Sequence, residues 1–361
     1  MRRGVIVLGM HRSGTSALAG VLAQAGAVLP KNLMKPSPEN ERGFFESTKF
    51  CKFHDKFLES VGSSWRDWRQ LRLNPSSEET MQFSAQARKL LAEEFGGADL
   101  FLLKDPRMCR LMPLWLNVLE DARIEPRIVI TLRSPFEVAE SLKARNGFEP
   151  EISVLLWLQY LLSAERDTRG RCRCFTSMEQ LLADWRVLLS RVAAELNLEW
   201  PAFDAGIEER VTQFLSRELK HHNSVPDRKN LVFAWAMGAF DAFLHLTRDP
   251  SSIHALNSLD AISSNLEKAY SLFEKIYVNQ QHLFSNIQSE IISLKKSCAD
   301  LEDENNIIKV ELEEMSQRHS VLSSERDAIL QELKQAREKR QPPPDESAKG
   351  NSNADARQAA E

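Results

Sequence analysis

The sequence predicts a three-layer α/β fold in which a doubly wound parallel sheet is followed by a long C-terminal coiled-coil helix. Three observations predict it: four short apolar runs, helix-like segments between these runs, and a heptad pattern near the C-terminus. The chain has 361 residues, 42% of them hydrophobic and 27% charged. It is therefore long enough to bury one sizeable core and leave an accessory region.

The predicted strands are the four apolar runs. They read GVIVLG, ADLFLLKDP, PRIVITLRSP and RCRCFT, at residues 4–9, 98–106, 126–135 and 171–176. Each run is bounded by turn or polar residues and shows no apolar/polar alternation. Such continuous runs are typical of strands that are covered on both faces, as in a parallel sheet with helices on both sides.

Helices are predicted between the strands. One spans 16–26 and ends at a glycine. Another spans 134–145, where Ser134 is the expected N-cap, Pro135 takes the first helical position and Glu137 is placed to complete a capping box. This alternation of strands and helices is what a parallel sheet requires.

A heptad repeat begins beyond the segment LTRDPSS. From Leu259 onward, apolar residues recur at alternating steps of three and four, and no Pro or Gly interrupts them until the tail. One extra residue shifts the frame before Ile291. The pattern predicts a coiled coil with one stutter, which we expect to form a homodimer. The predicted domains are residues 1–250, a coiled coil over 259–340, and a Pro-broken, polar, disordered tail over 341–361.

Charge and cysteine content exclude several classes of protein. A formal net charge of -4 gives no reason to expect nucleic acid as a partner. No apolar run approaches the ~18–20 residues of a transmembrane segment. The five cysteines are scattered and odd in number, and Cys172 and Cys174 have no further ligands at zinc spacing. We therefore expect a cytoplasmic protein without a disulfide framework.

The loop GMHRSGTS, at residues 9–16, follows the first strand and enters the first helix. It resembles a Walker A loop with Ser16 in the Ser/Thr place, but Thr15 stands where the lysine belongs and the nearest cation is Arg12. Such a loop presents backbone N–H groups and a helix N-terminus to one anion. The strand IVITL ends in Arg133 rather than a Walker B aspartate, so the predicted anion needs no metal.

Three motifs in order carry a family resemblance. GMHRSGTS resembles the 5'-phosphosulfate loop of sulfotransferases that use 3'-phosphoadenosine 5'-phosphosulfate (PAPS), particularly the branch that includes tyrosylprotein sulfotransferases. LLKDPR is similar to the K-D-P element of that branch, and LRSPFEVAESL resembles the family's 3'-phosphate signature. The resemblance covers residues 10–245. It implies a P-loop-type fold and transfer of a sulfuryl group from PAPS to a hydroxyl or, as a second possibility, an amine.

The resemblance also implies residue roles. The residues that would surround the 5'-phosphosulfate are His11, Arg12, Ser13, Gly14, Thr15 and Ser16. Arg12 would in addition stabilise the sulfuryl group during transfer, and Lys104 would support the same charge and the leaving phosphate. Arg133 and Ser141, eight residues apart, would bind the 3'-phosphate that distinguishes PAPS from ATP.

Transfer to a hydroxyl needs a base within hydrogen-bond reach. The resemblance offers Glu46, which follows Phe44 and Phe45, although its separation from the loop is longer than in the tyrosylprotein branch. Bacterial relatives with a G-[FY]-[FW]-E element favour Glu46 over Glu39 or Glu41. His54 is the reserve candidate.

Other interpretations stay open at this stage. The acceptor is unidentified, with a saccharide or other glycan-related molecule favoured over a peptide or small molecule. A P-loop nucleotide or nucleoside kinase would need Arg12 to replace the lysine and Asp105 to bind magnesium. A non-catalytic adaptor would act through the coiled coil. Lys104 and Asp105 could form a surface ion pair, and Glu46 could be a solvated carboxylate. The aromatic residues expected to pack the core, or to floor an acceptor cleft, are Trp65, Trp68, Trp157 and Tyr160.

Overall fold

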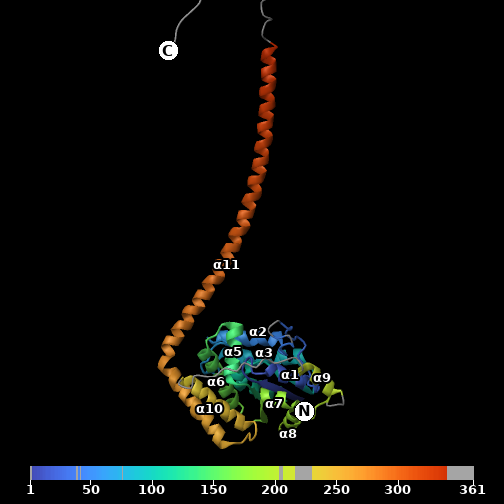
Figure 1. Ribbon diagram of the computed structural model, residues 1–361, viewed down its shortest axis with the longest axis vertical. Helices are drawn as coiled ribbons and strands as arrows, with labels where there is room; N and C mark the ends of the chain where they lie inside the picture. The colour runs from blue at the N-terminus through green and yellow to red at the C-terminus, as the bar shows by residue number, and fades with distance from the viewer. Residues whose placement is uncertain are drawn as a thin grey trace, which may run out of the picture. The chain divides into compact units, whose positions relative to one another are not determined.

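The structure, a computed structural model, describes residues 2–37, 40, 42–74, 76–202, 206–215 and 230–339. The chain divides into two compact units, with the boundary between Phe273 and Glu274. The first unit is the α/β domain, and the second contains most of the long C-terminal helix (Figure 1).

The α/β domain is built on a four-stranded parallel sheet in the order β2-β1-β3-β4. Its strands are β1 (Arg2–Leu8), β2 (Leu100–Lys104), β3 (Ile124–Leu132) and β4 (Arg173–Ser177). All four predicted strands are therefore confirmed. Because the strands are parallel, the segments that follow β1, β2 and β3 leave the same edge of the sheet, which is where open α/β sheets bind ligands.

Helices cover both faces of the sheet. They are α1 (Thr15–Gln24), α2 (Thr48–Ser60), α3 (Glu78–Phe95), α4 (Met108–Asp121), α5 (Pro135–Asn146), α6 (Pro150–Asp167), α7 (Met178–Ala183), α8 (Trp185–Glu195), α9 (Ile207–Leu215), α10 (Leu231–Leu246) and α11 (Ile253–Glu338). One core contains residues of α4, α6 and α10, and the other contains residues of α1, α8 and α9. The three layers confirm the predicted fold class.

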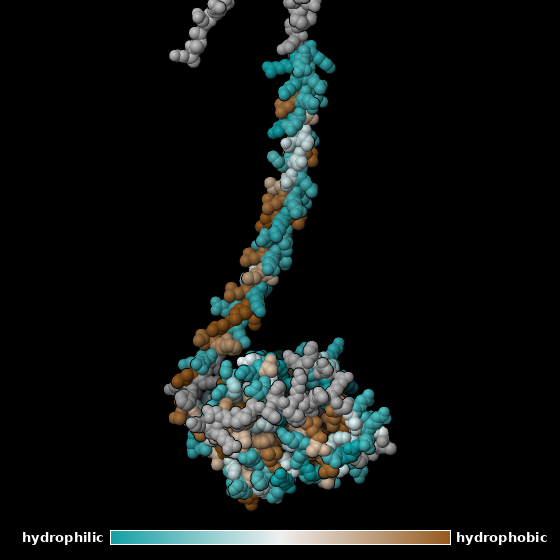
Figure 2. Space-filling model, in the orientation of Figure 1, coloured by the Kyte–Doolittle hydropathy of each residue, from teal (hydrophilic) through white to brown (hydrophobic). Residues whose placement is uncertain are grey.

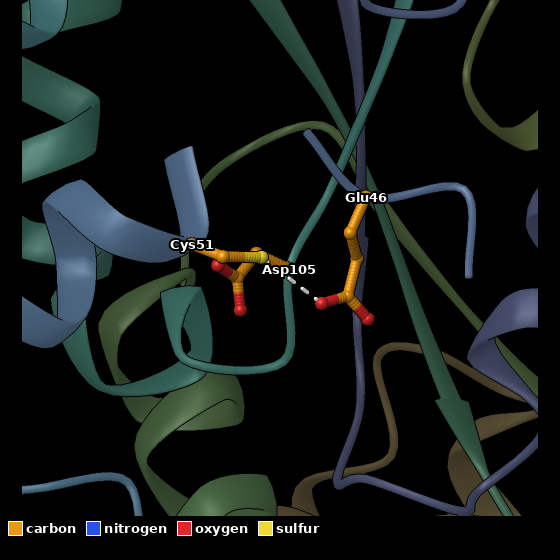
Figure 3. A group of neighbouring side chains, drawn as sticks. All are labelled: Glu46, Cys51 and Asp105. Atoms are coloured by element: carbon orange, nitrogen blue, oxygen red, sulfur yellow. Dashed lines mark hydrogen bonds between the residues drawn. The ribbon is translucent and has the colours of Figure 1, made fainter. Parts of the chain in front are cut away.

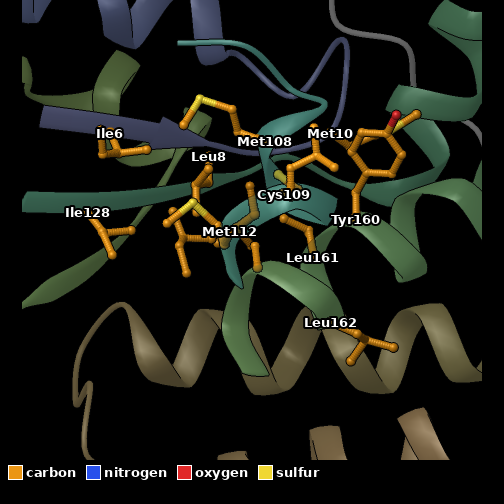
Figure 4. Close-up of a cluster of buried hydrophobic side chains, with 14 of the residues drawn as sticks. Ile6, Leu8, Met10, Met108, Cys109, Met112, Ile128, Tyr160, Leu161 and Leu162 are labelled. Carbon is orange, nitrogen blue, oxygen red and sulfur yellow. The ribbon is translucent and has the colours of Figure 1, made fainter. Parts of the chain in front are cut away.

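Strand β1 shows why the predicted strands lack alternation. Its side chains point alternately to opposite faces, so Ile6 and Leu8 enter the core beside α4 and α6 (Figure 4). Val5 and Val7 enter the core beside α1. All four side chains are fully buried, so both faces of the strand require apolar residues.

The predicted capping box at the start of α5 is not formed. Ser134 occupies the N-cap position and Pro135 begins the helix, but no side-chain cap hydrogen bond is present among the described residues of this turn. Glu137 instead accepts a hydrogen bond from Nε of Arg133 at 2.5 Å. A guanidinium is a stronger partner for a carboxylate than a backbone amide, so the ion pair replaces the cap.

The first turns of α11 belong to the α/β domain. Ala255, Leu259 and Leu266 are buried in its core, although the heptad pattern assigns the last two to the coiled coil. The predicted boundaries at 250 and 259 therefore fall inside the first unit, which extends to Phe273. The predicted tail at 341–361 lies outside the described residues.

Beyond Phe273, α11 continues as one helix to Glu338. Apolar side chains recur along it between polar ones (Figure 2), and they are exposed from Leu283 to Leu333. Of the helices that the structure describes, none combines the length and the apolarity needed to cross a membrane.

Candidate functional site

The loop after β1 has the form that the sequence predicts. Gly14 is the N-cap of α1 and has a left-handed backbone, with φ 83°. A Cβ atom there would lie 2.5 Å from Sδ of Met178, and one at Gly9 would lie 2.6 Å from the carbonyl oxygen of Thr131. The N–H of Gly9 donates to Sγ of Cys109 at 3.1 Å. Glycine is thus required at both ends of the loop, which leads directly into the N-terminus of α1.

Arg12 lies within this loop and has a left-handed backbone, with φ 70°. Non-glycine residues in this conformation carry strain and cluster at functional sites. Its Nε donates to Oγ of Ser141 on α5 at 2.7 Å. Two predicted site residues, 129 positions apart, are therefore in direct contact.

Lys104, at the end of β2, brings three segments together. Its Nζ donates to Oγ of Ser16 at 3.1 Å, to the carbonyl oxygen of Phe44 at 2.9 Å and to Oε1 of Glu46 at 2.5 Å. The lysine is only 3% exposed. Lys104 therefore forms a buried ion pair with Glu46, and the surface pair with Asp105 that the sequence left open is not formed.

Both carboxylate oxygens of Glu46 have proton donors. Oε2 accepts from Sγ of Cys51 at 3.2 Å (Figure 3) and lies 3.9 Å from the Arg107 guanidinium. Burial, together with the charges of Asp105 and Glu46, raises the pKa of the Cys51 thiol far above its ordinary value, so the thiol stays protonated. Glu46 is 5% exposed and is not a solvated carboxylate.

His54, the reserve base, is hydrogen-bonded at both ring nitrogens. The indole N–H of Trp115 donates to Nε2 of His54 at 3.0 Å, and because an indole nitrogen only donates, Nε2 must accept. Nδ1 then carries the proton and donates to Oδ2 of Asp105 at 2.8 Å. His54 is fully buried. Its Nε2 therefore has no lone pair left for an acceptor hydroxyl.

Asp105 holds Arg107 in place. Its Oδ1 accepts from the backbone N–H and from Nη1 of Arg107, both at 3.0 Å. Burial alone would raise the pKa of Asp105, but the charge of Arg107 and the hydrogen bond from His54 hold it well below its ordinary value. The carboxylate is fully buried and engaged on both oxygens, so it is poorly placed to bind the magnesium that a kinase requires.

One group among the described residues has metal-ligating atoms close together: Glu46, Cys51 and Asp105 (Figure 3). Its atoms do not fit a metal ion. The two carboxylates pair with the cations of Lys104 and Arg107. These cations already neutralise the negative charge that would attract a metal.

Arg133 lies at the end of β3, as predicted, and is tied to its surroundings. The indole N–H of Trp157 donates to its carbonyl oxygen at 3.1 Å, and Glu137 pairs with its guanidinium. Ser141 follows on the same helix as Glu137 and is 8% exposed. The two residues that the sequence predicts to bind a 3'-phosphate thus both lie at this edge of the sheet, and the acidic Glu137 pairs with one of them.

Comparisons with known proteins find distant likenesses. No family model matches the chain, and no curated protein matches it. The sulfotransferase STF1 from Mycobacterium tuberculosis H37Rv is 12% identical, with a TM-score of 0.35 over 59% of this chain and 71% of that one. The sulfotransferase domain from the curacin biosynthetic pathway is 16% identical, with a TM-score of 0.34 over 60% and 79%. These likenesses are too distant to decide a reaction.

Sequence reasoning missed three residues of the site: Cys51, Arg107 and Glu137. Arg107 directly follows the K-D-P element, and its charge next to a conspicuous Lys-Asp pair was the available signal. Cys51 lies five residues after Glu46, in the first turn of α2, but nothing in the sequence shows that the two side chains meet.

Two loop side chains have buried polar atoms without a partner among the described residues. They are Oγ of Ser13 and Nε2 of His11. Burial, with the charges of Arg107 and Arg145, lowers the pKa of His11 well below its ordinary value, so its imidazole is neutral. Buried polar atoms are normally hydrogen-bonded, and their lack of partners indicates a place for a ligand.

Proposed function

We propose that the protein transfers a sulfuryl group from PAPS to a hydroxyl, or less readily an amine, of a saccharide or other glycan-related acceptor. One observation carries the proposal: Lys104 donates both to Ser16 of the anion-binding loop and to Glu46. A cation, a candidate base and an anion-binding loop therefore meet at a single nitrogen atom. This is the set of groups that transfer of an anionic group to a hydroxyl requires.

Each residue has a separate task. The backbone N–H groups of 14–16, the Ser13 hydroxyl and the N-terminus of α1 bind the 5'-phosphosulfate, while the N–H of Ser13 donates to the carbonyl oxygen of Met10. PAPS supplies the sulfuryl group and leaves as 3'-phosphoadenosine 5'-phosphate. Arg12 stabilises the negative charge that spreads over the oxygens during transfer. Arg133 and Ser141 bind the 3'-phosphate.

The Lys104–Glu46 pair links removal of the proton from the acceptor hydroxyl to stabilisation of the negative charge on the leaving phosphate. Glu46 accepts the proton of the acceptor hydroxyl and so becomes neutral. Lys104 then loses its buried counter-ion, and its cation is available for the phosphate oxygen that gains negative charge. The pair thus stabilises charge where it develops, while each group is neutralised by the other before the reaction.

The kinase interpretation has less support. The loop has no lysine at the Walker A position, and Asp105 is occupied by Arg107 and His54. The adaptor interpretation does not account for a buried lysine, a buried glutamate and a left-handed arginine assembled around one loop. Buried ion pairs are costly to assemble, so an arrangement of this kind favours catalysis.

The proposal predicts selective binding of 3'-phosphoadenosine 5'-phosphate without any metal. Because hydrogen bonds to charged groups contribute about 1.5–3 kcal/mol each, removal of the 3'-phosphate should weaken binding by ~10²-fold or more. Calorimetry on the full chain, with 3'-phosphoadenosine 5'-phosphate, AMP and ATP plus magnesium, measures this directly. Equal affinity for AMP, or dependence of binding on magnesium, would contradict the proposal.

A second prediction concerns the base. Glu46→Gln should keep affinity for 3'-phosphoadenosine 5'-phosphate and lower kcat by ~10²–10⁴-fold, the usual contribution of general base catalysis. Glu165→Gln is a matched control, because Glu165 is a buried carboxylate that pairs with two arginines at another place in the domain. Wild-type turnover by the Glu46→Gln enzyme would show that another group takes the proton.

A further inference from the structure

Two stacked aromatic rings and an arginine form a surface beside the loop. We call Trp65, Arg66 and Phe148 the aromatic platform. The rings of Trp65 and Phe148 stack with their centroids 5.7 Å apart. The Arg66 guanidinium lies over both, 5.2 Å from the Trp65 ring and 5.6 Å from that of Phe148. Both rings are half-buried and Arg66 is exposed, so part of the platform faces solvent.

The aromatic platform contacts residues next to the proposed donor site at two points. The Trp65 ring packs against the His11 imidazole at 4.9 Å, and His11 directly precedes Arg12 in the loop. The Arg145 guanidinium lies 5.8 Å from the same ring, one helical turn after Ser141 on α5. The platform therefore continues the surface formed by the loop and α5.

Hydrogen bonds fix the backbone of the segment that carries Trp65. Trp65 lies between α2 and α3, and its carbonyl oxygen accepts from the Tyr160 hydroxyl at 2.7 Å. Arg110, only 3% exposed, donates to the carbonyl oxygens of Ser64 at 2.6 Å and Arg69 at 3.1 Å. A buried arginine thus supports the segment on both sides of Trp65. These side chains are already ordered in the folded protein, so binding a ligand would lose little further conformational entropy.

The chemistry of the platform defines the ligand. In the described part of the chain, the Arg66 side chain contacts the two rings and pairs with no carboxylate. A guanidinium in this situation binds a carboxylate or phosphate. The half-buried rings offer apolar surface, and the His11 imidazole, whose Nε2 has no hydrogen-bond partner among the described residues, packs against the Trp65 ring. Apolar surface, a cation that can bind an anionic group and a nitrogen able to form a hydrogen bond are thus provided together.

We propose that the aromatic platform is the acceptor subsite, and that it takes a saccharide ring bearing an anionic group, a carboxylate or a phosphate. The saccharide ring packs against the solvent-facing part of the Trp65–Phe148 pair, and Arg66 pairs with the anion. This inference rests on the proposed sulfotransferase function and names the class of its acceptor.

Calorimetry with matched sugars tests the inference on the full chain, with and without saturating 3'-phosphoadenosine 5'-phosphate. Methyl β-D-glucuronide and methyl β-D-glucoside differ only in the carboxylate, and glucose 6-phosphate supplies the phosphate arm. The wild type should bind an anionic sugar ~10-fold more tightly than the glucoside. Arg66→Gln should reduce that ratio to about one, and Trp65→Ala should weaken binding of all three sugars.

Arg186→Gln is the matched control, because Arg186 also lies over a tryptophan ring, 4.7 Å from Trp185 on α8. It should leave the preference unchanged. If 3'-phosphoadenosine 5'-phosphate binds, three results would overturn this inference while leaving the proposed function intact. They are equal affinity for charged and neutral sugars, an unchanged ratio in Arg66→Gln, and tighter binding of 4-nitrophenol than of the anionic sugars. If 3'-phosphoadenosine 5'-phosphate does not bind, the proposed function fails, and the acceptor role fails with it.

Discussion

Replacement of Arg12 by alanine is expected to lower kcat by ~10²–10³-fold and to change the affinity for PAPS much less. Loss of one donor to the transition state typically has this effect, because the interaction strengthens only as charge develops. Lys104→Met should behave in the same way. Arg133→Ala should do the opposite, with weaker binding and a nearly unchanged kcat, since the 3'-phosphate does not react.

Because Lys104 is buried, its replacement can destabilise the fold as well as lower kcat, so the two effects must be measured separately. Removal of its charge breaks a buried ion pair, which typically costs about 3–5 kcal/mol, and leaves Glu46 with only the Arg107 guanidinium, 3.9 Å away, as a counter-ion. Methionine keeps the volume of the side chain, and the affinity for 3'-phosphoadenosine 5'-phosphate shows whether the variant is folded. Lys49→Met is the control, because Lys49 forms an exposed ion pair with Glu93. An Arg12→Ala enzyme with the wild-type kcat would refute the role of Arg12.

The sheet could be predicted because its strands obey a strong constraint. Residues of β1 enter two different cores in alternation, so every position needs an apolar side chain. That requirement is visible in the sequence as an uninterrupted run. The loop could be predicted for a similar reason, since Gly9 and Gly14 stand where a Cβ atom would meet neighbouring atoms.

The contacts within the site could not be predicted. Glu137 is three residues after Ser134 and four after Arg133, and these spacings suit a capping box and a helical ion pair equally well. Only the structure shows which one forms. His54 likewise has the residue type of a base, and its burial beneath Trp115 depends on a contact 61 residues away.

The heptad pattern was ambiguous for a related reason. A spacing of three and four describes both a coiled-coil seam and a helix that packs on its own domain. Leu259 and Leu266 lie on the part of the helix that packs on its own domain, because they are buried in the α/β core. The large apolar side chains from Leu283 to Leu333 are exposed. This later part of α11 is available to pair with another chain.

We expect the full chain to be a parallel dimer joined through α11 beyond Phe273. In the second frame the d positions are Leu294, Leu301, Ile308, Met315, Leu322, Ile329 and Ala336. An apolar row of this length needs burial against a partner. Asn305, at an a position, is the kind of polar residue that fixes register and favours two strands. Truncation after Phe273 keeps the buried first turns of α11, and it should give a monomer that still binds 3'-phosphoadenosine 5'-phosphate.

Two point variants distinguish residues in the coiled-coil interface from residues that are merely exposed on the helix. Ile308 at a d position and Val310 at an f position are both β-branched and similarly exposed, at 52% and 58%. Ile308→Asp should raise the dimer dissociation constant by ~10²-fold or more, because each chain would bury a charge in the seam. Val310→Asp should leave the dimer intact, since f positions face solvent. Light scattering measures the mass of each protein. A monomeric full chain, a dimeric truncated chain, or equal effects of the two variants would show that the heptads do not assemble the protein.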